Sequence, residues 1–179
     1  MIDEKILKRL NAPTKKERLD NLRQEALSVD FPPMNPRYIN NHIHTFYSFS
    51  PYSPSAAVYA ARAEGLCTAG IVDHDSMGGA EEFIEAGKIL GLPVTVGVEA
   101  RVSMAGTPFE RLRTNNPDQL GISYMVLHAV PHKSIPMVQA YFAPLREARN
   151  RRNREMTAAI NRLSGQDIDF EKDVLPLSM

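Results

Sequence analysis

Histidines gather at three places in the chain. The five are His42 and His44, then His74, then His128 and His132. In a β-strand, residues i and i+2 project from the same face, so His42 and His44 at a strand end can direct two imidazoles at one point. Such a pair is suited to chelating a metal ion, although a surface pair beside Asn40 and Asn41 is the alternative interpretation of an isolated His-x-His motif.

Acidic side chains accompany the later motifs. Asp73 and Asp75 flank His74 directly after an apolar segment, and Glu99 ends the next apolar segment. A neighbouring carboxylate commonly orients a metal-bound imidazole, which is a role for Asp73, whereas Asp75 could cap the following helix. A buried carboxylate at a strand end needs a cation or an ion-pair partner. We therefore expect Glu99 either to bind a metal ion or to form a salt bridge with Arg101.

The elements that must position these residues alternate in type. Hydrophobic patterns and helix-ending glycines predict strands at 38–43, 68–72, 94–98 and 122–130, with helices at 54–65 and 79–90 between the first three. Such alternation is typical of parallel strands joined by right-handed helical crossovers, hence an α/β sheet or barrel. Ligands in these folds lie at the carboxyl ends of the strands, where His42, His74 and Glu99 are expected to meet.

A helical arm precedes this domain. Apolar residues at helical spacing predict a helix over the first ten residues, and Thr14 with Glu17 forms a capping box for a second one. Three prolines between residues 32 and 36 then interrupt regular structure. We therefore divide the chain into an arm, 1–36, and a main domain, 37–179, which ends in a long helix after Pro136.

Composition excludes several classes of protein. The chain has 21 lysine and arginine residues and 21 aspartate and glutamate residues, so its net charge is zero. It therefore has no overall positive charge that would favour binding to nucleic acid or to an anionic membrane. Cys67 is the only cysteine, which excludes an internal disulfide and suits the cytoplasm. No stretch approaches the roughly 18 apolar residues of a membrane span. The arginines between Arg146 and Arg154 leave nucleic acid possible as a partner, but a solvated helix face is the favoured interpretation.

These motifs resemble the PHP (polymerase and histidinol phosphatase) family of metal-dependent phosphoesterases. The resemblance rests on NNHIHTFYSFSPYSP at 40–54, GIVDHDSMGGA at 70–80 and GLPVTVGVEAR at 91–101. Bacterial PHP-domain proteins with an N-terminal helical arm also share the segment NNPDQ at 115–119. The resemblance implies a distorted (β/α) barrel of parallel strands with two or three divalent metal ions, zinc, manganese or iron, at the strand ends.

The resemblance also implies individual roles. The metal ligands would be His42, His44, His74, Glu99 and His128. Glu99 would bridge two ions, and Asp73 with Glu99 would take part in catalysis. His128 is expected on the strand after the glutamate, and His132 is the alternative, because the long segment after Glu99 leaves the register open.

Two departures from the family pattern stand out. Where members usually carry aspartate or histidine, shortly after the opening motif, this chain has Phe49 and Ser50. The family's late histidine and Asp-x-His ligands have no counterpart after His132. We therefore expect an incomplete barrel, the front portion of such a domain, and an open sheet of this kind would leave a strand edge exposed.

The implied function is hydrolysis of a phosphate ester by a metal-activated water. The substrate would be a phosphorylated small molecule or nucleotide, as a phosphomonoester or a nucleotide phosphodiester. Two alternatives remain open: hydrolysis of an amide or cyclic amide by the same chemistry, and a non-catalytic module that the metal only stabilises.

Overall fold

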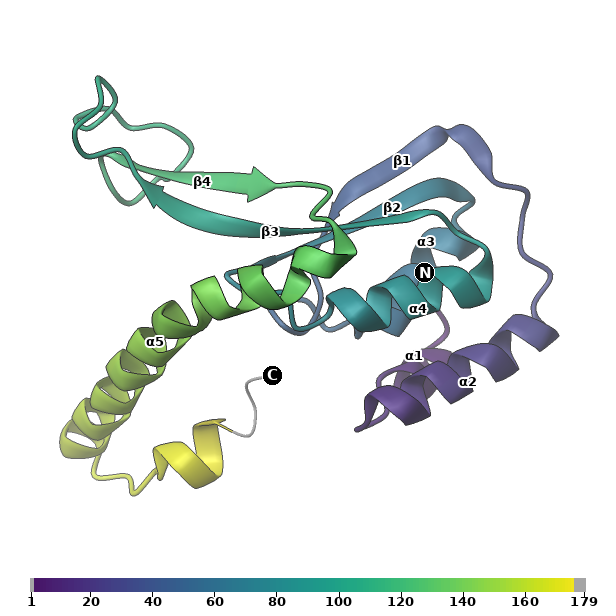
Figure 1. Ribbon diagram of the computed structural model, residues 1–179. Helices are drawn as coiled ribbons and strands as arrows, with labels where there is room; N and C mark the ends of the chain where they lie inside the picture. Colours follow the sequence, from purple (N-terminus) through teal and green to yellow (C-terminus); the bar gives the residue numbers. More distant parts are fainter. Residues whose placement is uncertain (1, 176–179) are drawn as a thin grey trace. The chain divides into compact units, whose positions relative to one another are not determined.

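Strands and helices alternate along the first part of the chain. The computed structural model describes residues 2–175, and the contacts divide them after Ile135 into two units (Figure 1). The first residue of the predicted arm, 1–36, and the last four of the predicted main domain, 37–179, lie outside the described part. In chain order the first unit contains α1 (Glu4–Leu10), α2 (Lys15–Ser28), β1 (Asn35–Ile43), α3 (Pro54–Ala63), β2 (Leu66–His74), α4 (Ala80–Leu90), β3 (Val94–Ser103), β4 (Ile122–Leu127) and the 3-10 turn η1 (His132–Ser134).

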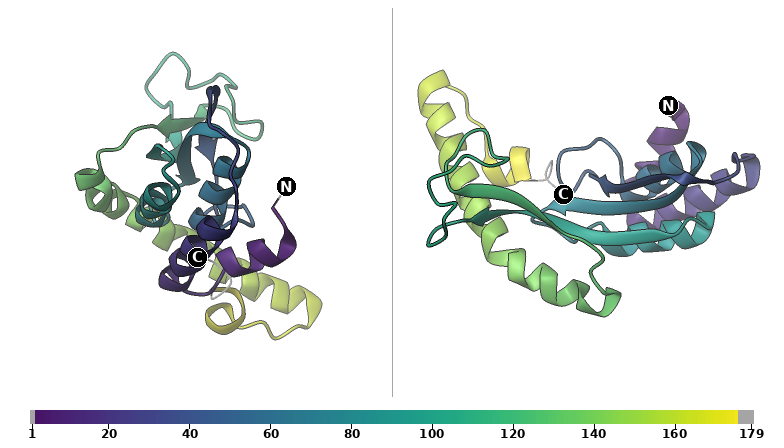
Figure 2. Two further views of the ribbon diagram at one scale, coloured as in Figure 1. Left: turned by 90° about the vertical axis from the view of Figure 1, so that its right-hand side faces the viewer. Right: turned by 90° about the horizontal axis from the view of Figure 1, so that it is seen from above.

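The four strands form one curled sheet in the order β1-β2-β3-β4, an incomplete α/β barrel as predicted (Figure 2). β1, β2 and β3 are parallel, with α3 and α4 as the crossovers. β4 is antiparallel to β3, so the expectation of parallel strands needs correction there. The physical reason is the connection, because residues 104–121 hold turns and no helix to carry the chain back across the sheet.

One face of the sheet carries the core. Figure 1 shows α3 and α4 on the same side of the sheet, where α3 packs on β2 and α4 on β3. Ile71 of β2, Val96 and Val98 of β3 and Phe83 of α4 are buried in this layer. Alternate strand residues point to opposite faces. The other, open face therefore carries the remaining residues of β2 and β3, His74 and Glu99 among them.

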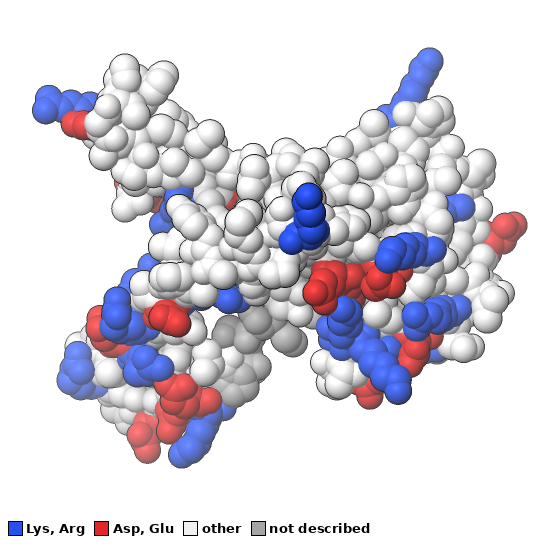
Figure 3. All heavy atoms as spheres, viewed as in Figure 1, with Lys and Arg blue, Asp and Glu red and all other residues white. Residues whose placement is uncertain are grey.

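The N-terminal helices pack onto this unit. α2 begins at the predicted capping box, in which the Glu17 N–H donates to Thr14 Oγ1 and the Thr14 N–H to Glu17 Oε2. α2 contacts α3 and α4, and Arg18 with Glu82 forms a buried ion pair, Nη2 to Oε2 2.6 Å. Charges of both signs alternate over α2 and α4 on the surface (Figure 3). The boundary between residues 36 and 37 stays a prediction.

Asparagine side chains form hydrogen bonds with backbone groups of the two outer strands. The Asn115 side chain accepts from the Tyr124 N–H at 2.9 Å and donates to the Tyr124 carbonyl at 2.8 Å, as a neighbouring strand would. On β1, the N–H groups of Arg37 and His42 donate to the side chains of Asn35 and Asn40, each at 3.0 Å. These contacts satisfy polar backbone groups at the margins of the sheet.

Gly97 on β3 sets how closely β4 can approach. A Cβ at this position would lie against the carbonyl oxygen of Leu127 and 3.1 Å from Val72 Cγ1. We expect Gly97→Ala to destabilise the protein by about 1–3 kcal/mol through overpacking. Thermal unfolding measures this effect. A loss below about 0.5 kcal/mol in Gly97→Ala would contradict the packing argument.

The second unit, residues 136–175, contains most of α5 (Ile135–Ser164) and the helical turn η2 (Phe170–Val174). The long helix predicted after Pro136 is confirmed, with Pro144 inside it. Arg154 pairs with Glu171 and lies 4.9 Å from the ring centroid of Phe170. Arg154, one of the arginines between Arg146 and Arg154, thus contributes to the packing of this unit. Among residues 2–175, no helix has both the length and the apolar composition for crossing a membrane.

Candidate metal centre

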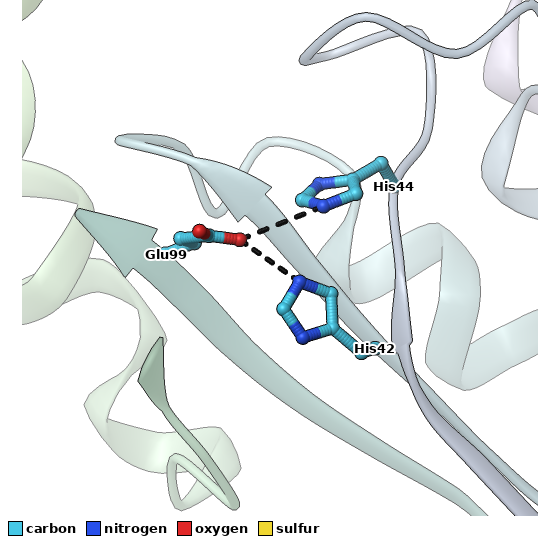
Figure 4. A group of neighbouring side chains, drawn as sticks. All are labelled: His42, His44 and Glu99. Carbon is cyan, nitrogen blue, oxygen red and sulfur yellow. Dashed lines mark hydrogen bonds and ion pairs between the residues drawn. The ribbon is translucent and has the colours of Figure 1, made fainter. Parts of the chain in front are cut away.

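Three histidines surround one oxygen of Glu99. Glu99 Oε2 lies 2.9 Å from His42 Nε2, 3.5 Å from His44 Nε2 and 4.0 Å from His74 Nε2. Figure 4 shows the rings of His42 and His44 pointing at the carboxylate from one side. The carboxylate is largely buried, and the His74 ring stacks on the His44 ring with centroids 5.0 Å apart. The structure thus brings together four of the predicted ligands.

The strand register creates this arrangement. His74, the last residue of β2, pairs directly with Glu99 on β3, so both side chains leave the same face. On β1 the register shifts between Asn40 and Ile43. This irregularity affects the direction in which the side chains of His42 and His44 leave the chain. A Cβ at Gly70 would lie 2.8 Å from Asn41 Cα. The glycine therefore gives the irregular part of β1 room to approach β2.

The distances suit a shared cation. Ligand atoms about 2.1 Å from a tetrahedral ion are about 3.4 Å from one another, and the separations of the histidine nitrogens from Glu99 Oε2, 2.9, 3.5 and 4.0 Å, fall on both sides of that value. The candidate ligand atoms of His42, His44 and Glu99 all lie within 4.8 Å of one another. His44 Nδ1 is buried without a hydrogen-bond partner among the described residues. A metal ion held through Nε2 would not contact this nitrogen, and an ordered water would supply its partner.

The protonation of His44 also suits a ligand. Burial, followed by the charges of His74 and His42, lowers the pKa of His44, while Glu99 opposes the shift. The lowered pKa favours the neutral imidazole, the form that binds metals. The alternative salt bridge is wrong, since no nitrogen of Arg101 lies within 4.0 Å of Glu99 among the described ion pairs.

Asp73 does not join the histidines. It pairs with Val98 and faces the core, where both carboxylate oxygens accept hydrogen bonds of 2.6 Å from Thr45, one from the N–H and one from the hydroxyl. Burial raises the pKa of Asp73 to about 6, against the effect of these hydrogen bonds. Thr45 follows His44 directly. The geometry therefore favours a positioning role, through Thr45, over the direct catalytic role predicted for Asp73.

His128 stays outside the group. It follows β4, is exposed and lies beside Gly97, because the antiparallel strand pairs Val126 with Glu99 and carries later residues away from the carboxylate. His132 begins the exposed turn η1. The structure does not support a ligand role for either residue, and the cause is the direction of β4, which the pattern of apolar residues does not reveal.

Two aromatic residues border the group instead. The Phe49 ring lies 4.6 Å from the His44 ring and 5.3 Å from the His74 ring. Tyr124 of β4 lies edge-on to His74 at 5.7 Å. Tyr124 was missed from sequence. Its position follows from the antiparallel register, which pairs it with Arg101, two residues after Glu99 and on the same face.

The sequence pattern of the PHP domain matches residues 40–163. The chain belongs to the PHP domain family. The match spans β1 to α5 and includes every residue of the candidate metal centre. The resemblance inferred from the three motifs is confirmed.

Other PHP-containing proteins match part of the chain. Error-prone DNA polymerases from Mycobacterium bovis and Mycobacterium tuberculosis are 34% identical over 96 residues, which is 52% of this chain. The matched segment is 8% of the length of those polymerases. The similarity therefore concerns this domain alone.

Two crystal structures share the fold. A candidate metal-dependent phosphoesterase from Bifidobacterium adolescentis has a TM-score of 0.56 and 27% identity, over 80% of this chain and 44% of its own. An amidohydrolase from Chromobacterium violaceum, with bound sulfate and no metal, has a TM-score of 0.57 and 24% identity, over 78% and 45%. This PHP chain spans less than half the length of either protein.

Proposed function

We propose that this PHP domain is a metal-dependent hydrolase of phosphate esters. The observation that carries the proposal is the convergence of His42, His44 and His74 on one oxygen of Glu99. The phosphoesterase from B. adolescentis lends support by fold and sequence. The expected metals are zinc, manganese or iron, two or three per site, and the expected substrate is a phosphomonoester or a nucleotide phosphodiester.

The residues of the site have two kinds of role: some would hold the metal ion, and others orient its ligands or the substrate. A divalent ion in such a site supplies Lewis acidity and an activated water nucleophile. His42, His44 and Glu99 would hold one ion, and His74 would serve a further one, with the carboxylate of Glu99 offsetting part of the charge. Asp73 fixes Thr45 and thereby the backbone that carries His44. Arg101, on the same face as Glu99, is a cation that can contact phosphate oxygens as negative charge develops on them.

Arg101 also discriminates between the candidate reactions. Within residues 2–175, no carboxylate oxygen lies within 4.0 Å of its guanidinium among the ion pairs. An unpaired guanidinium near a metal centre is suited to a phosphate dianion and has no evident use for a neutral amide. We therefore place amide or cyclic-amide hydrolysis second, and a non-catalytic module third.

Metal removal and replacement tests the proposal. We expect purified protein to contain stoichiometric metal and to hydrolyse p-nitrophenyl phosphate or its bis ester. Chelation should abolish turnover, and zinc or manganese should restore it, because the nucleophile depends on the ion. Turnover of hydantoin without turnover of either phosphate ester would favour the amide alternative. Metal that raises the melting temperature without any turnover would favour the non-catalytic module.

A further inference from the structure

The β1–α3 loop begins beside the candidate metal centre. Thr45, which follows His44, donates from its N–H and from its hydroxyl to the two carboxylate oxygens of Asp73, each at 2.6 Å. Further along the loop, the Ser48 hydroxyl accepts a hydrogen bond of 3.0 Å from the His74 N–H. The start of the loop is therefore bonded to the end of β2, next to two of the candidate metal ligands.

One hydrogen bond joins the start of this loop to its end. The Phe46 N–H, directly after Thr45, donates to the Tyr52 carbonyl at 2.9 Å. Between these residues, the N–H groups of Ser48 and Ser50 donate to the Thr45 carbonyl at 3.0 and 3.2 Å. The position of Tyr52 at the end of the loop therefore limits where the start of the loop can lie.

Asn11, the residue that follows α1, holds the end of the loop. Its Nδ2 donates to the Pro51 carbonyl and its Oδ1 accepts from the Ser53 N–H, both at 2.8 Å. Pro51 and Ser53 flank Tyr52, so one side chain fixes the backbone on both sides of the residue that bonds the loop's start. Asparagine suits this role because its amide carries a donor and an acceptor side by side.

The helical arm that carries this asparagine is itself anchored. Leu10, the last residue of α1, is fully buried, and its carbonyl accepts from the Ser53 hydroxyl at 2.6 Å. On α2, Arg18 forms the buried ion pair with Glu82 and lies 5.0 Å from the ring centroid of Phe46. The arm is therefore fixed to α4 and contacts the β1–α3 loop at both its start and its end.

We propose that Asn11 is a positioning residue of the metal centre, which acts through the β1–α3 loop on His44 and His74. The contacts connect Asn11 to the backbone around Tyr52, Tyr52 to Phe46, and the start of the loop to β2. Metal ligands must be held close to their binding geometry, so a looser loop should weaken metal binding. The inference rests on the proposed function, because it requires a metal ion at the centre, and it makes the helical arm part of the site.

The metal affinity of two arm variants tests the inference. Zn²⁺ is titrated into the metal-free protein in competition with a chromogenic chelator. We expect Asn11→Ala to weaken Zn²⁺ binding about tenfold, the lower end of the effect of residues that orient metal ligands. Asn21→Ala is the matched control, because it removes a side-chain hydrogen bond of 2.8 Å to the Arg9 carbonyl within the arm. This control should keep native Zn²⁺ affinity, and equal losses of affinity in both variants would overturn the inference.

Two further readouts distinguish positioning from general stability. The absorption spectrum of bound Co²⁺ depends on where the ligands lie, so it should change in Asn11→Ala and stay native in Asn21→Ala. Ser48→Ala removes the acceptor of the His74 N–H and should weaken Zn²⁺ binding by itself. Combined with Asn11→Ala, it should weaken binding by less than the product of the two single effects, because both act through one loop. An unchanged Co²⁺ spectrum in Asn11→Ala, or a full product of effects, would overturn the inference.

Hydrogen exchange in the native protein tests the same coupling without any substitution. Coupling is reciprocal, so an ion whose affinity depends on the end of the loop must in turn stabilise that end. Zn²⁺ should therefore slow exchange of the Ser53 N–H more than exchange of the Leu92 N–H, which donates to the Gly87 carbonyl after α4. Equal slowing at both groups would overturn the inference, and this comparison decides the matter where Asn11→Ala does not fold.

The outcomes separate this inference from the proposed function. Native Zn²⁺ affinity in Asn11→Ala overturns the role of Asn11 and leaves hydrolysis of phosphate esters standing. Zn²⁺ binding without turnover of p-nitrophenyl phosphate or its bis ester counts against the function, while the affinities still decide the role of Asn11. A native protein that binds no Zn²⁺ would overturn both.

Discussion

Glu99→Gln should lower the metal content of the purified protein about tenfold or more, and it should reduce the rate of hydrolysis by several orders of magnitude. Three imidazole nitrogens lie within 4.0 Å of a single Glu99 oxygen, so the carboxylate is the common partner of the group. Glutamine keeps the shape of the side chain and removes its charge. Elemental analysis and steady-state kinetics measure the two effects.

A matched control separates charge at the site from charge in general. Glu85→Gln makes the same chemical change on α4, where the half-exposed side chain of Glu85 pairs with Lys88. We expect native metal content and activity in this variant. Circular dichroism should be unchanged in both variants. Native metal content in Glu99→Gln would remove Glu99 from the ligand set and with it the geometric basis of the proposed function.

Glu82→Ala should destabilise the protein by about 3–5 kcal/mol, the usual effect of removing one partner from a buried ion pair. Glu82 accepts from Arg18 Nε at 2.9 Å, from Arg18 Nη2 at 2.6 Å and from the Ser55 hydroxyl at 2.7 Å. Its loss leaves a buried guanidinium without a countercharge. Against a total stability of about 5–15 kcal/mol, the shift should be plain in urea unfolding.

The neighbouring ion pair provides the control. Lys15 and Glu81 join the same two helices at 3.1 Å, but both side chains are exposed. Glu81→Ala should therefore change stability by less than about 1 kcal/mol. Combining Arg18→Met with Glu82→Met should restore much of what either single change removes, because no unpaired buried charge remains. A double variant as unstable as the sum of the two would contradict this explanation.

Local signals predicted much of the fold from sequence. The capping box at Thr14 and the left-handed Gly91 that ends α4 depend on neighbouring residues, and both are confirmed. The convergence of His42, His74 and Glu99 followed from placing each at the end of a parallel strand. These inferences needed only short motifs and the order of the elements.

Features that depend on distant residues could not be predicted in this way. The direction of β4 leaves no trace in its own apolar pattern, and an antiparallel β4 exchanges His128 for Tyr124 at the centre. The buried pair of Arg18 and Glu82 joins residues 64 apart in the chain. Only the packing of α2 on α4 shows that these two charges meet.

Asn115, at the β4 margin of the sheet, bears on how an open barrel resists pairing with other chains. Unpaired strand edges are templates for pairing with another chain. Asn115 already bonds both backbone groups of Tyr124 on β4, the last strand of the sheet. An incoming strand would have to displace this side chain before gaining a hydrogen bond at Tyr124. A short polar side chain thus gives a half-barrel some of the protection that ring closure gives a complete one.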